Sequence, residues 1–167
     1  MRSELISGFL QHLDADGELG VGVDTAKTEA AVEALPLPIG LKRIIQWSWP
    51  QKYGQFGPLE IFDVESILEE ECLDVFLKHS LLPVGKAGNG DWLVIYFAEA
   101  DRCPVGFVRL FDPQERMPDL SKDYFQLEAS LERFLFRAAE GLYLPGDSYE
   151  CAAWDSFTRE LEPRKPA

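Results

Sequence analysis

The sequence predicts a single α+β domain with a mostly antiparallel sheet flanked by helices. Helical patterns gather toward the two ends of the chain, and two apolar strand patterns, 92–97 and 105–112, lie in its second half. Because only a short polar turn joins these strands, they are expected to pair as an antiparallel hairpin. The 167 residues suffice for one buried core, so helices around one central sheet are the expected architecture.

Residues 2–13 are predicted to form a short amphipathic helix, because apolar side chains recur there at intervals of four positions. The next stretch, DADGELGVGVD, resembles a calcium loop, but Gly17 follows Asp14 by three positions where the EF-hand needs five. We therefore expect no calcium there. A second helix should begin at Asp24 or Thr25 and run through Ala34. Its expected packing face is made of Ala30, Ala31 and Ala34.

The middle of the chain predicts a third helix, a strand and further helix. Pro38 suits the first turn of the third helix. The strand is LEIF at 59–62, Asp63 is a cap, and 64–79 predicts one helix or two short ones. The expected inward residues are Leu41, Ile44, Ile45 and Trp49 in the third helix, and Ile67, Leu68, Phe76 and Leu77 farther along.

The second half predicts the central strand. Trp92 to Phe97 is apolar at every position, so both faces of this strand should be covered. In the next strand Val105, Phe107 and Arg109 should share one face. The last helix should be capped by Ser130 and stopped by Gly141, with inward residues Leu131, Phe134, Leu135 and Ala138. The expected divisions are an N-terminal extension with a short helix at 1–24, the α+β domain at 25–157 and a frayed tail at 158–167.

The charge of the chain is one-sided, with 16 Lys and Arg against 29 Asp and Glu and a formal net charge of −13. Such a field repels nucleic acid and anionic lipid, and it attracts and orients a basic protein. We therefore expect a protein partner, and neither a nucleic acid nor a membrane. The alternative is that the acidity only keeps the protein in solution.

The cysteines and the N-terminus indicate a reducing compartment. Cys72, Cys103 and Cys151 form no close pair, which disfavours a disulfide framework and a zinc site. The N-terminus has acidic residues and no long apolar run, unlike a secretory signal, and no window approaches the roughly 20 apolar residues of a membrane span. These features predict a cytoplasmic protein with reduced thiols.

The stretch PVGKAGNGDWLVIYF, residues 83–97, has the glycines of a phosphate-binding loop but fits neither nucleotide fingerprint. A P-loop places its lysine at the start of a helix, whereas a strand follows Lys86, and an aspartate would repel phosphate. We expect a structural turn in which glycines permit positive φ and an aspartate binds loop N–H groups. Its residues are Gly85, Gly88, Gly90 and Asp91, with Asn89 and Gly90 as a favoured turn pair.

No pattern in the sequence predicts a catalytic residue, a cofactor or a metal site. His12 and His79 lie in no ligand or nucleophile motif and are expected on the surface or at a helix end. Carboxylates are abundant, so an enzyme that uses a carboxylate pair stays open as an alternative; it would require a closed cleft and a raised pKa.

Candidate partner-binding residues come from two patterns. Glu70 and Asp74 are four positions apart in a predicted helix and would form an acidic stripe with Glu69, either as a solvated face or as a landing site for basic side chains. Trp47 and Trp49 flank Ser48, and tryptophan is enriched both at interfaces and in cores. The candidates are Trp47, Trp49, Glu69, Glu70, Asp74 and the loop residue Asn89.

The order of these features resembles the SUKH superfamily, which includes a fungal cell-wall assembly regulator and many bacterial toxin-immunity proteins. The resemblance covers about residues 25–140. It runs through a leading helix ending in LP, a Trp-rich turn, LLPVGKAGNGDWLVIYF, PVGFVRLFD and SLERFL, with Gly85, Gly90 and Asp91 at the family's usual glycine and aspartate positions. The N-terminal segment and the stretch LYLPGDSYECAAWDSF depart from it.

The resemblance implies a single α+β domain that binds a protein and has no catalytic centre. Members of the immunity branch block a toxin, often a nuclease, and nucleases tend to be basic because they hold a phosphate backbone. The leading hypothesis is thus an immunity protein that neutralises a basic toxin domain. The alternative is an intracellular regulatory or scaffold module that binds a protein unrelated to toxins.

Overall fold

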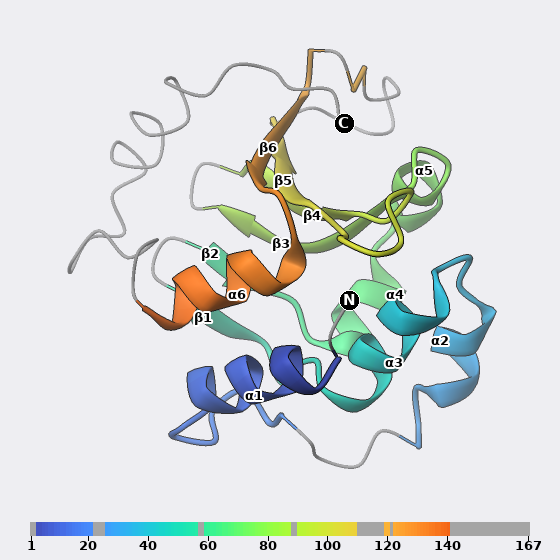
Figure 1. The fold of residues 1–167 in the computed structure, drawn as a ribbon. Coiled ribbons are helices and arrows are strands. Elements are labelled where there is room, and N and C mark those ends of the chain that lie inside the picture. The colour runs from blue at the N-terminus through green and yellow to red at the C-terminus, as the bar shows by residue number, and fades with distance from the viewer. Residues whose placement is uncertain are drawn as a thin grey trace.

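The computed structural model describes residues 3–21, 26–56, 59–87, 90–109, 119–120 and 122–140, with the backbone alone at Ser3 and Phe56. Over these ranges the chain forms an antiparallel sheet of six strands flanked by helices (Figure 1), which confirms the predicted fold class. The strands are β1 (Gly54–Phe56), β2 (Leu59–Ile61), β3 (Leu81–Ala87), β4 (Trp92–Tyr96), β5 (Val105–Val108) and β6 (Tyr124–Glu128). The helices are α1 (Ser3–Leu13), α2 (Glu29–Ala34), α3 (Ile39–Trp47), α4 (Val64–Glu69), α5 (Leu73–Leu77) and α6 (Leu131–Ala139).

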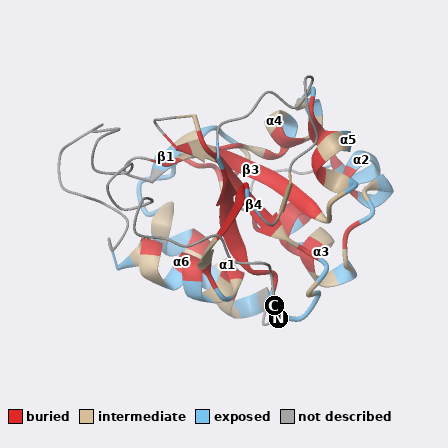
Figure 2. Ribbon diagram, turned by 90° about the horizontal axis from the view of Figure 1, so that it is seen from above, coloured by how far each residue is buried: buried red, intermediate tan, exposed pale blue. Residues whose placement is uncertain are grey.

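The strands lie in the sheet in the order of the sequence, so each one pairs with the strand before it and the strand after it. The β4–β5 hairpin is confirmed, with Leu93 opposite Phe107 and Trp92 opposite Val108. Because side chains alternate across a strand, Trp92 and Leu93 point to opposite faces. Both are buried, as are Val94 and Ile95, which confirms the expectation of a central strand covered on both faces (Figure 2).

Helices supply the cover on the two sides of the sheet. In Figure 2, α1, α3 and α6 lie on one side of the strands and α4 lies on the other. The short helix α5 packs against β3, and its Phe76 ring lies 5.0 Å from the ring of Trp92. Trp92 therefore points toward the α5 side, and the next residue, Leu93, points toward the opposite layer.

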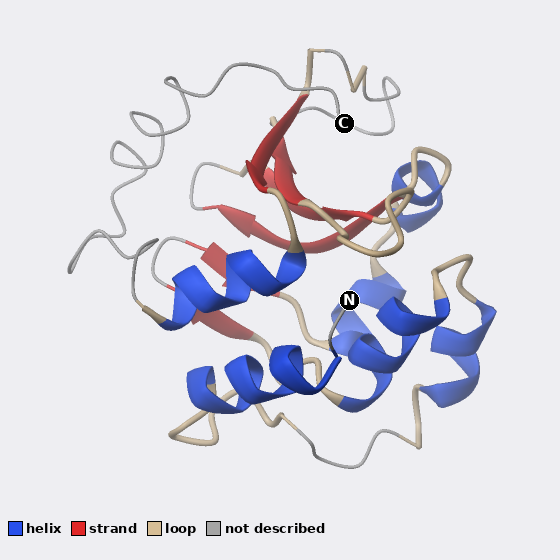
Figure 3. Cartoon of the chain, in the orientation of Figure 1, coloured by secondary structure: helices blue, strands red, loops and turns tan. Residues whose placement is uncertain are grey.

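Capping side chains mark the starts of two of the helices that Figure 3 draws, α4 and α6. Asp63 caps α4 by accepting a hydrogen bond from the backbone N–H of Ser66 at 2.7 Å, and Ser130 caps α6 by accepting from the N–H of Arg133 at 3.2 Å. Such caps satisfy backbone donors that have no partner inside the helix. The inward residues predicted for α3 and α6 are buried, and so are Ile67 and Phe76; Leu68 and Leu77 are partly buried against the core. Gly141 lies outside the described residues.

One helix prediction was wrong in detail, and an open alternative for another helix is now decided. The second helix begins only at Glu29, and Ala30, Ala31 and Ala34 are exposed, so the alanines do not form a packing face; Val32 is the buried residue of α2. Residues 64–79 form two helices, because Glu70 adopts an extended conformation with φ −62° and ψ 117° that ends α4. The predicted alternative of two short helices is therefore the correct one.

Three strands of the sheet, β1, β3 and β6, were not predicted from the sequence. β3 includes Pro83 and Gly85, which had been assigned to the glycine loop, and the β3–β4 register shifts between these two residues. β6 and the three-residue β1 were not predicted at all. Proline and glycine within a strand often mark such an irregularity in the ladder, so β3 has the composition of a loop while it pairs on both sides.

The N-terminal helix belongs to the same core as the sheet. Ile6 and Leu10 of α1 are fully buried, and α1 packs against both α6 and α3. The segment 1–24 therefore contributes core side chains through its described part. The predicted tail, 158–167, lies outside the described residues.

A buried carboxylate ties α6 to the sheet. Glu128, at the end of β6, is only 6% exposed and accepts ion-pair contacts from Nε of Arg133 at 2.9 Å and Nε of Arg137 at 3.1 Å. The two arginines are one helical turn apart on α6, so a single carboxylate fixes the orientation of the first two turns.

Replacing Glu128 by Gln should lower the free energy of unfolding by about 1–2 kcal/mol, because charge-assisted hydrogen bonds to both arginines are lost. Urea denaturation at neutral pH measures this change. The matched control is Glu140→Gln, which removes an exposed carboxylate and should change stability by less than about 0.5 kcal/mol. Equal effects of the two substitutions would contradict the assigned role of Glu128.

Gly85→Ala should destabilise the protein by about 2 kcal/mol or more, because the added Cβ would overlap the backbone carbonyl oxygen of Glu60 in the neighbouring strand β2. Gly8→Ala is the matched control. A Cβ at Gly8 meets no atom within 4 Å, and alanine in a helix is about 0.5–1 kcal/mol better than glycine. Urea midpoints should therefore move in opposite directions for the two variants.

Candidate protein-binding surface

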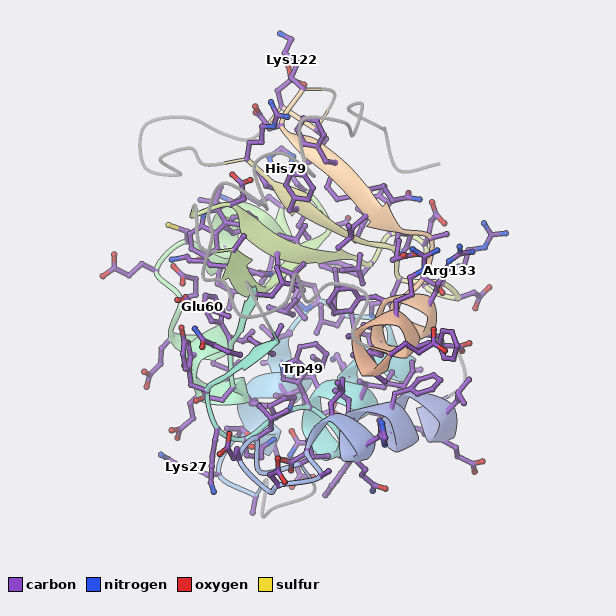
Figure 4. The ribbon with its side chains drawn as sticks, turned by 90° about the vertical axis from the view of Figure 1, so that its left-hand side faces the viewer. Lys27, Trp49, Glu60, His79, Lys122 and Arg133 are labelled. Carbon is purple, nitrogen blue, oxygen red and sulfur yellow. The ribbon has the colours of Figure 1, made fainter. Side chains whose placement is uncertain are left out.

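The two candidate tryptophans have opposite environments. Trp49 is 1% exposed and its indole Nε1 donates a hydrogen bond to the Phe62 carbonyl oxygen at 2.9 Å. Figure 4 shows it between the sheet and the helices. The expectation that Trp49 contacts a partner was therefore wrong, because the ring is a core side chain. Trp47, at the end of α3, is 59% exposed and remains a candidate.

Trp47 belongs to an exposed stripe on α3. Ile39, Arg43 and Trp47 are spaced by four residues, so they lie along one side of the helix, and all three are exposed. Ile39 is 70% exposed. Arg43 and Trp47 also line a groove of about 460 Å³ between α3 and α1. Its floor is tied together by a hydrogen bond between the hydroxyls of Ser7 and Ser48.

The acidic residues of α4 and α5 do not form the predicted helical stripe. Glu70 and Asp74 belong to different helices, because the chain is extended at Glu70. The structure instead places a run of surface carboxylates, here called the acidic segment, from the first turn of α4 to the first turn of α5. Glu65, Glu69, Glu71 and Asp74 are exposed and Glu70 is half-buried.

One basic side chain reaches the acidic segment from the turn before α2. Lys27 forms an ion pair with Glu65, and the hydrogen bond and charge of Glu65, with a smaller contribution from Glu69, raise the pKa of Lys27. Both side chains are largely exposed (Figure 4 shows Lys27 at the periphery). Such surface pairs contribute little to stability. The raised pKa of Lys27 mainly reflects the carboxylates that lie close together in this region.

The glycine loop is shorter than predicted. Gly85 lies in β3, where the absence of a side chain lets the backbone of β2 come close. Its φ is not positive, so the predicted positive φ was wrong. Gly90 has φ 91°, as predicted, and its N–H donates to the Ala87 carbonyl oxygen at 2.8 Å. Gly88 and Asn89 lie outside the described residues. Asp91 is buried at 5% exposure, and the predicted bonding of its carboxylate stays a prediction.

The Lys86 ammonium group packs over two aromatic rings. Its Nζ lies 3.8 Å from the centroid of the Trp92 ring and 5.8 Å from that of Phe62. Lys86 also sits between Glu60 and Trp92 in the sheet register. A lysine stacked on two rings and beside a carboxylate stabilises the surface of the sheet, and this geometry differs from a lysine directed at a phosphate.

Burial favours the neutral forms of two titratable side chains, Cys103 before β5 and Tyr124 in β6. Burial, more than the carboxylates of Asp101 and Glu99, raises the pKa of the Cys103 thiol to about 11, and burial also raises the pKa of Tyr124 well above its ordinary range. Nucleophilic cysteines need the opposite shift, since the thiolate is the reactive form. Cys72 and Cys103 are both buried, whereas Cys151 lies outside the described residues.

The histidines lie at helix ends, and the aspartate-rich loop is held by hydrogen bonds to its own backbone. His12 is exposed at the end of α1, and His79 follows α5 with its Nε2 buried and unpartnered. Both oxygens of Asp14 accept backbone hydrogen bonds, from Leu19 at 2.6 Å and from Val21 at 2.8 Å. In the part of the chain that the structure describes, no group of three or more potential ligands could hold a metal.

Sequence reasoning predicted neither the α1–α3 groove nor a second groove on the other side of α1. The second groove lies between α1 and α6, has a volume of about 480 Å³, and contains the exposed ring of Phe136. Gly8 lines both grooves. A glycine in the middle of an amphipathic helix was the available signal, since it costs stability unless the site needs a small residue.

Comparisons with protein-family models, with curated proteins and with solved structures give no match to this chain. Within the described ranges, no helix has the length and apolar character needed to cross a membrane. The surface features above therefore carry the functional argument.

Trp49→Phe should destabilise the protein by about 2 kcal/mol or more, because it leaves a cavity and an unpaired buried carbonyl oxygen at Phe62. Trp47→Phe is the matched control and should change stability by less than about 0.5 kcal/mol. Thermal and urea denaturation of the two variants measure the difference. A larger effect at Trp47 would contradict the assignment of core and surface.

Proposed function

We propose that this protein is a non-enzymatic binding domain that recognises a basic protein surface, most concretely a toxin domain that it neutralises. The single observation that carries this proposal is the distribution of charge. Between Leu59 and Leu77 the sequence contains seven carboxylates and no lysine or arginine. Five of these carboxylates form the acidic segment at the surface of α4 and α5.

A concentrated acidic surface suits recognition of a basic partner. Like charges on neighbouring elements repel one another and disfavour the isolated folded chain. A cationic partner relieves this repulsion, and complementary fields accelerate encounter and orient the two proteins. The acidic segment and the net charge of −13 therefore support a partner rich in lysine and arginine.

The choice of a toxin as the partner comes from the sequence resemblance to SUKH-type immunity proteins. A nuclease toxin holds a phosphate backbone with basic side chains, so an acidic protein could occupy the same surface. The proposed mechanism is direct: the bound domain covers the basic surface of the toxin and excludes its substrate. No bond-making step by this chain is part of the proposal.

Reversing two charges in the acidic segment should weaken binding of a toxin encoded beside this gene. For the double variant Glu69→Lys and Asp74→Lys we expect about tenfold slower association at low salt, since exposed charges act mainly on the association rate. Surface plasmon resonance at two salt concentrations measures the rates, and inhibition of toxin activity measures neutralisation.

The control carries the same change in net charge at another exposed place, Asp16→Lys and Glu18→Lys in the loop after α1. A local site requires that the control slows association much less than the double variant does. Equal slowing would assign the effect to the overall field, and an adjacent toxin that neither binds nor loses activity on mixing would sink the immunity proposal for that pair.

A further inference from the structure

The groove between α1 and α6 is open and largely apolar. Its volume is about 480 Å³, and it is enclosed on two sides by helices that pack against each other. Its apolar lining is formed by Leu5, Phe9, Phe136 and Ala139. The two aromatic rings meet edge to face, with centroids 5.7 Å apart and planes at 63°. This pair forms a rigid apolar floor.

The exposure of Phe136 leaves this floor without a full cover. The Phe136 side chain is 45% exposed, although α6 buries Leu131, Phe134, Leu135 and Ala138 toward the core. Large aromatic side chains that stand exposed beside a groove are a common anchor point for a partner, since burying them releases hydration free energy at little cost in side-chain entropy. Solubility alone would favour a polar residue at this position.

Because Gly8 has no side chain, the backbone of α1 is exposed along this side of the groove. Gly8 is exposed in the middle of an eleven-residue helix, and an added Cβ would meet no atom within 4 Å. Packing inside this chain therefore does not require glycine, even though glycine weakens a helix by about 1 kcal/mol relative to alanine. A bare backbone at this point allows another helix to approach α1 closely, as small residues do at helix crossings.

The charges around the groove select a cationic occupant. Glu4 and Glu140 both line it. Helices α1 and α6 run side by side in the same direction (Figure 1), so their C-terminal ends, which carry partial negative charge, meet at the end where Glu140 lies. The described charged side chains of the lining are thus carboxylates, with His12 beside them. A lysine or arginine beside Glu140 would meet this carboxylate and the negative helix ends together, and one beside Glu4 would meet a carboxylate.

We propose that the α1–α6 groove binds an amphipathic helix of a partner protein, with apolar side chains on the Phe9–Phe136 floor and lysine or arginine side chains beside Glu4 and Glu140. This is the helix-in-groove mode of recognition, in which apolar anchors recur at helical spacing. The groove lies on α1 and α6, away from the acidic segment of α4 and α5 in the view of Figure 2. The proposal therefore holds whether or not the chain neutralises a toxin.

A model peptide can test this groove without a known partner. The probe is an 18-residue helical peptide with leucine along one face and lysine on the other, titrated into the full ¹⁵N-labelled chain while amide shifts are followed. We expect saturable binding with the largest shifts at residues 4–12 and 136–140. Replacing every lysine of the peptide by glutamate should weaken binding at least tenfold.

The decisive variant is Phe136→Gln, which removes a ring that is 45% exposed. It should weaken peptide binding at least fivefold, and because the edge-to-face contact with Phe9 is also lost, it should lower the midpoint of urea unfolding slightly while the chain stays folded under the conditions of the titration. The matched control is Ile39→Gln, which removes an equally apolar and more exposed side chain on α3 and should bind the peptide as the wild type does. Similar binding by wild type and Phe136→Gln would overturn the proposal.

Three other outcomes would assign the peptide or the groove differently, and each of them would overturn the proposal. Amide shifts confined to α4 and α5 would mean that the peptide binds the acidic segment through charge alone. A wild-type dimer in sedimentation that dissociates in Phe136→Gln would assign the groove to a second copy of this chain. Tighter binding of a synthetic peptide of residues 141–161 at the same amides would assign it to the chain's own C-terminal sequence.

Discussion

The burial of β4 on both faces is the constraint on which the rest of the structure depends. Trp92 and Val94 face one side of the sheet and Leu93 and Ile95 the other, and each is 6% exposed or less. A strand with two apolar faces needs a packed layer on each side. The short helix α5 meets Trp92 on one side, and the layer containing α1, α3 and α6 covers the opposite side (Figure 2). These helices are therefore held at fixed positions, and their outward faces form a rigid surface.

The elements that could be predicted from sequence are those whose own residues carry a clear pattern of burial or a capping signal. β4 is uniformly apolar, α3 and α6 repeat apolar residues at helical spacing, and Asp63 and Ser130 mark helix starts. β3 could not be recognised because Pro83 and Gly85 are turn-forming residues, and their tolerance within a strand depends on a register shift and on the nearby backbone of Glu60. Those features arise only when β2 and β4 are already in place. Short edge strands such as β1 carry too few residues for a periodic pattern.

The candidate surface could be predicted in composition but only partly in geometry. Acidic residues around Glu69 were evident, yet the break at Glu70 divides them between two helices, and no helical wheel drawn through 64–79 could place them correctly. The two tryptophans illustrate the same limit. Tryptophan is common both at interfaces and in cores, and the choice between these roles rests on the hydrogen bond from Trp49 to the Phe62 carbonyl oxygen, a partner 13 residues away. The groove beside Phe136 requires α1 and α6 to be adjacent, and neither sequence pattern alone contains that information.

The position of the apolar and acidic features has a physical consequence for recognition. Carboxylates on α4 and α5 act over a distance of about 10 Å at ordinary salt, so they orient an approaching basic protein before contact is made. Apolar side chains such as Phe136 act only after water has been expelled, so they control how long a complex lasts. Because the Glu128 ion pairs hold α6 to the sheet, and α1 packs against α6 and α3 with Ile6 and Leu10 buried, the Phe136 floor is already formed before binding. A preformed groove loses little conformational entropy when it is occupied, so more of the free energy of apolar contact remains to hold the complex together.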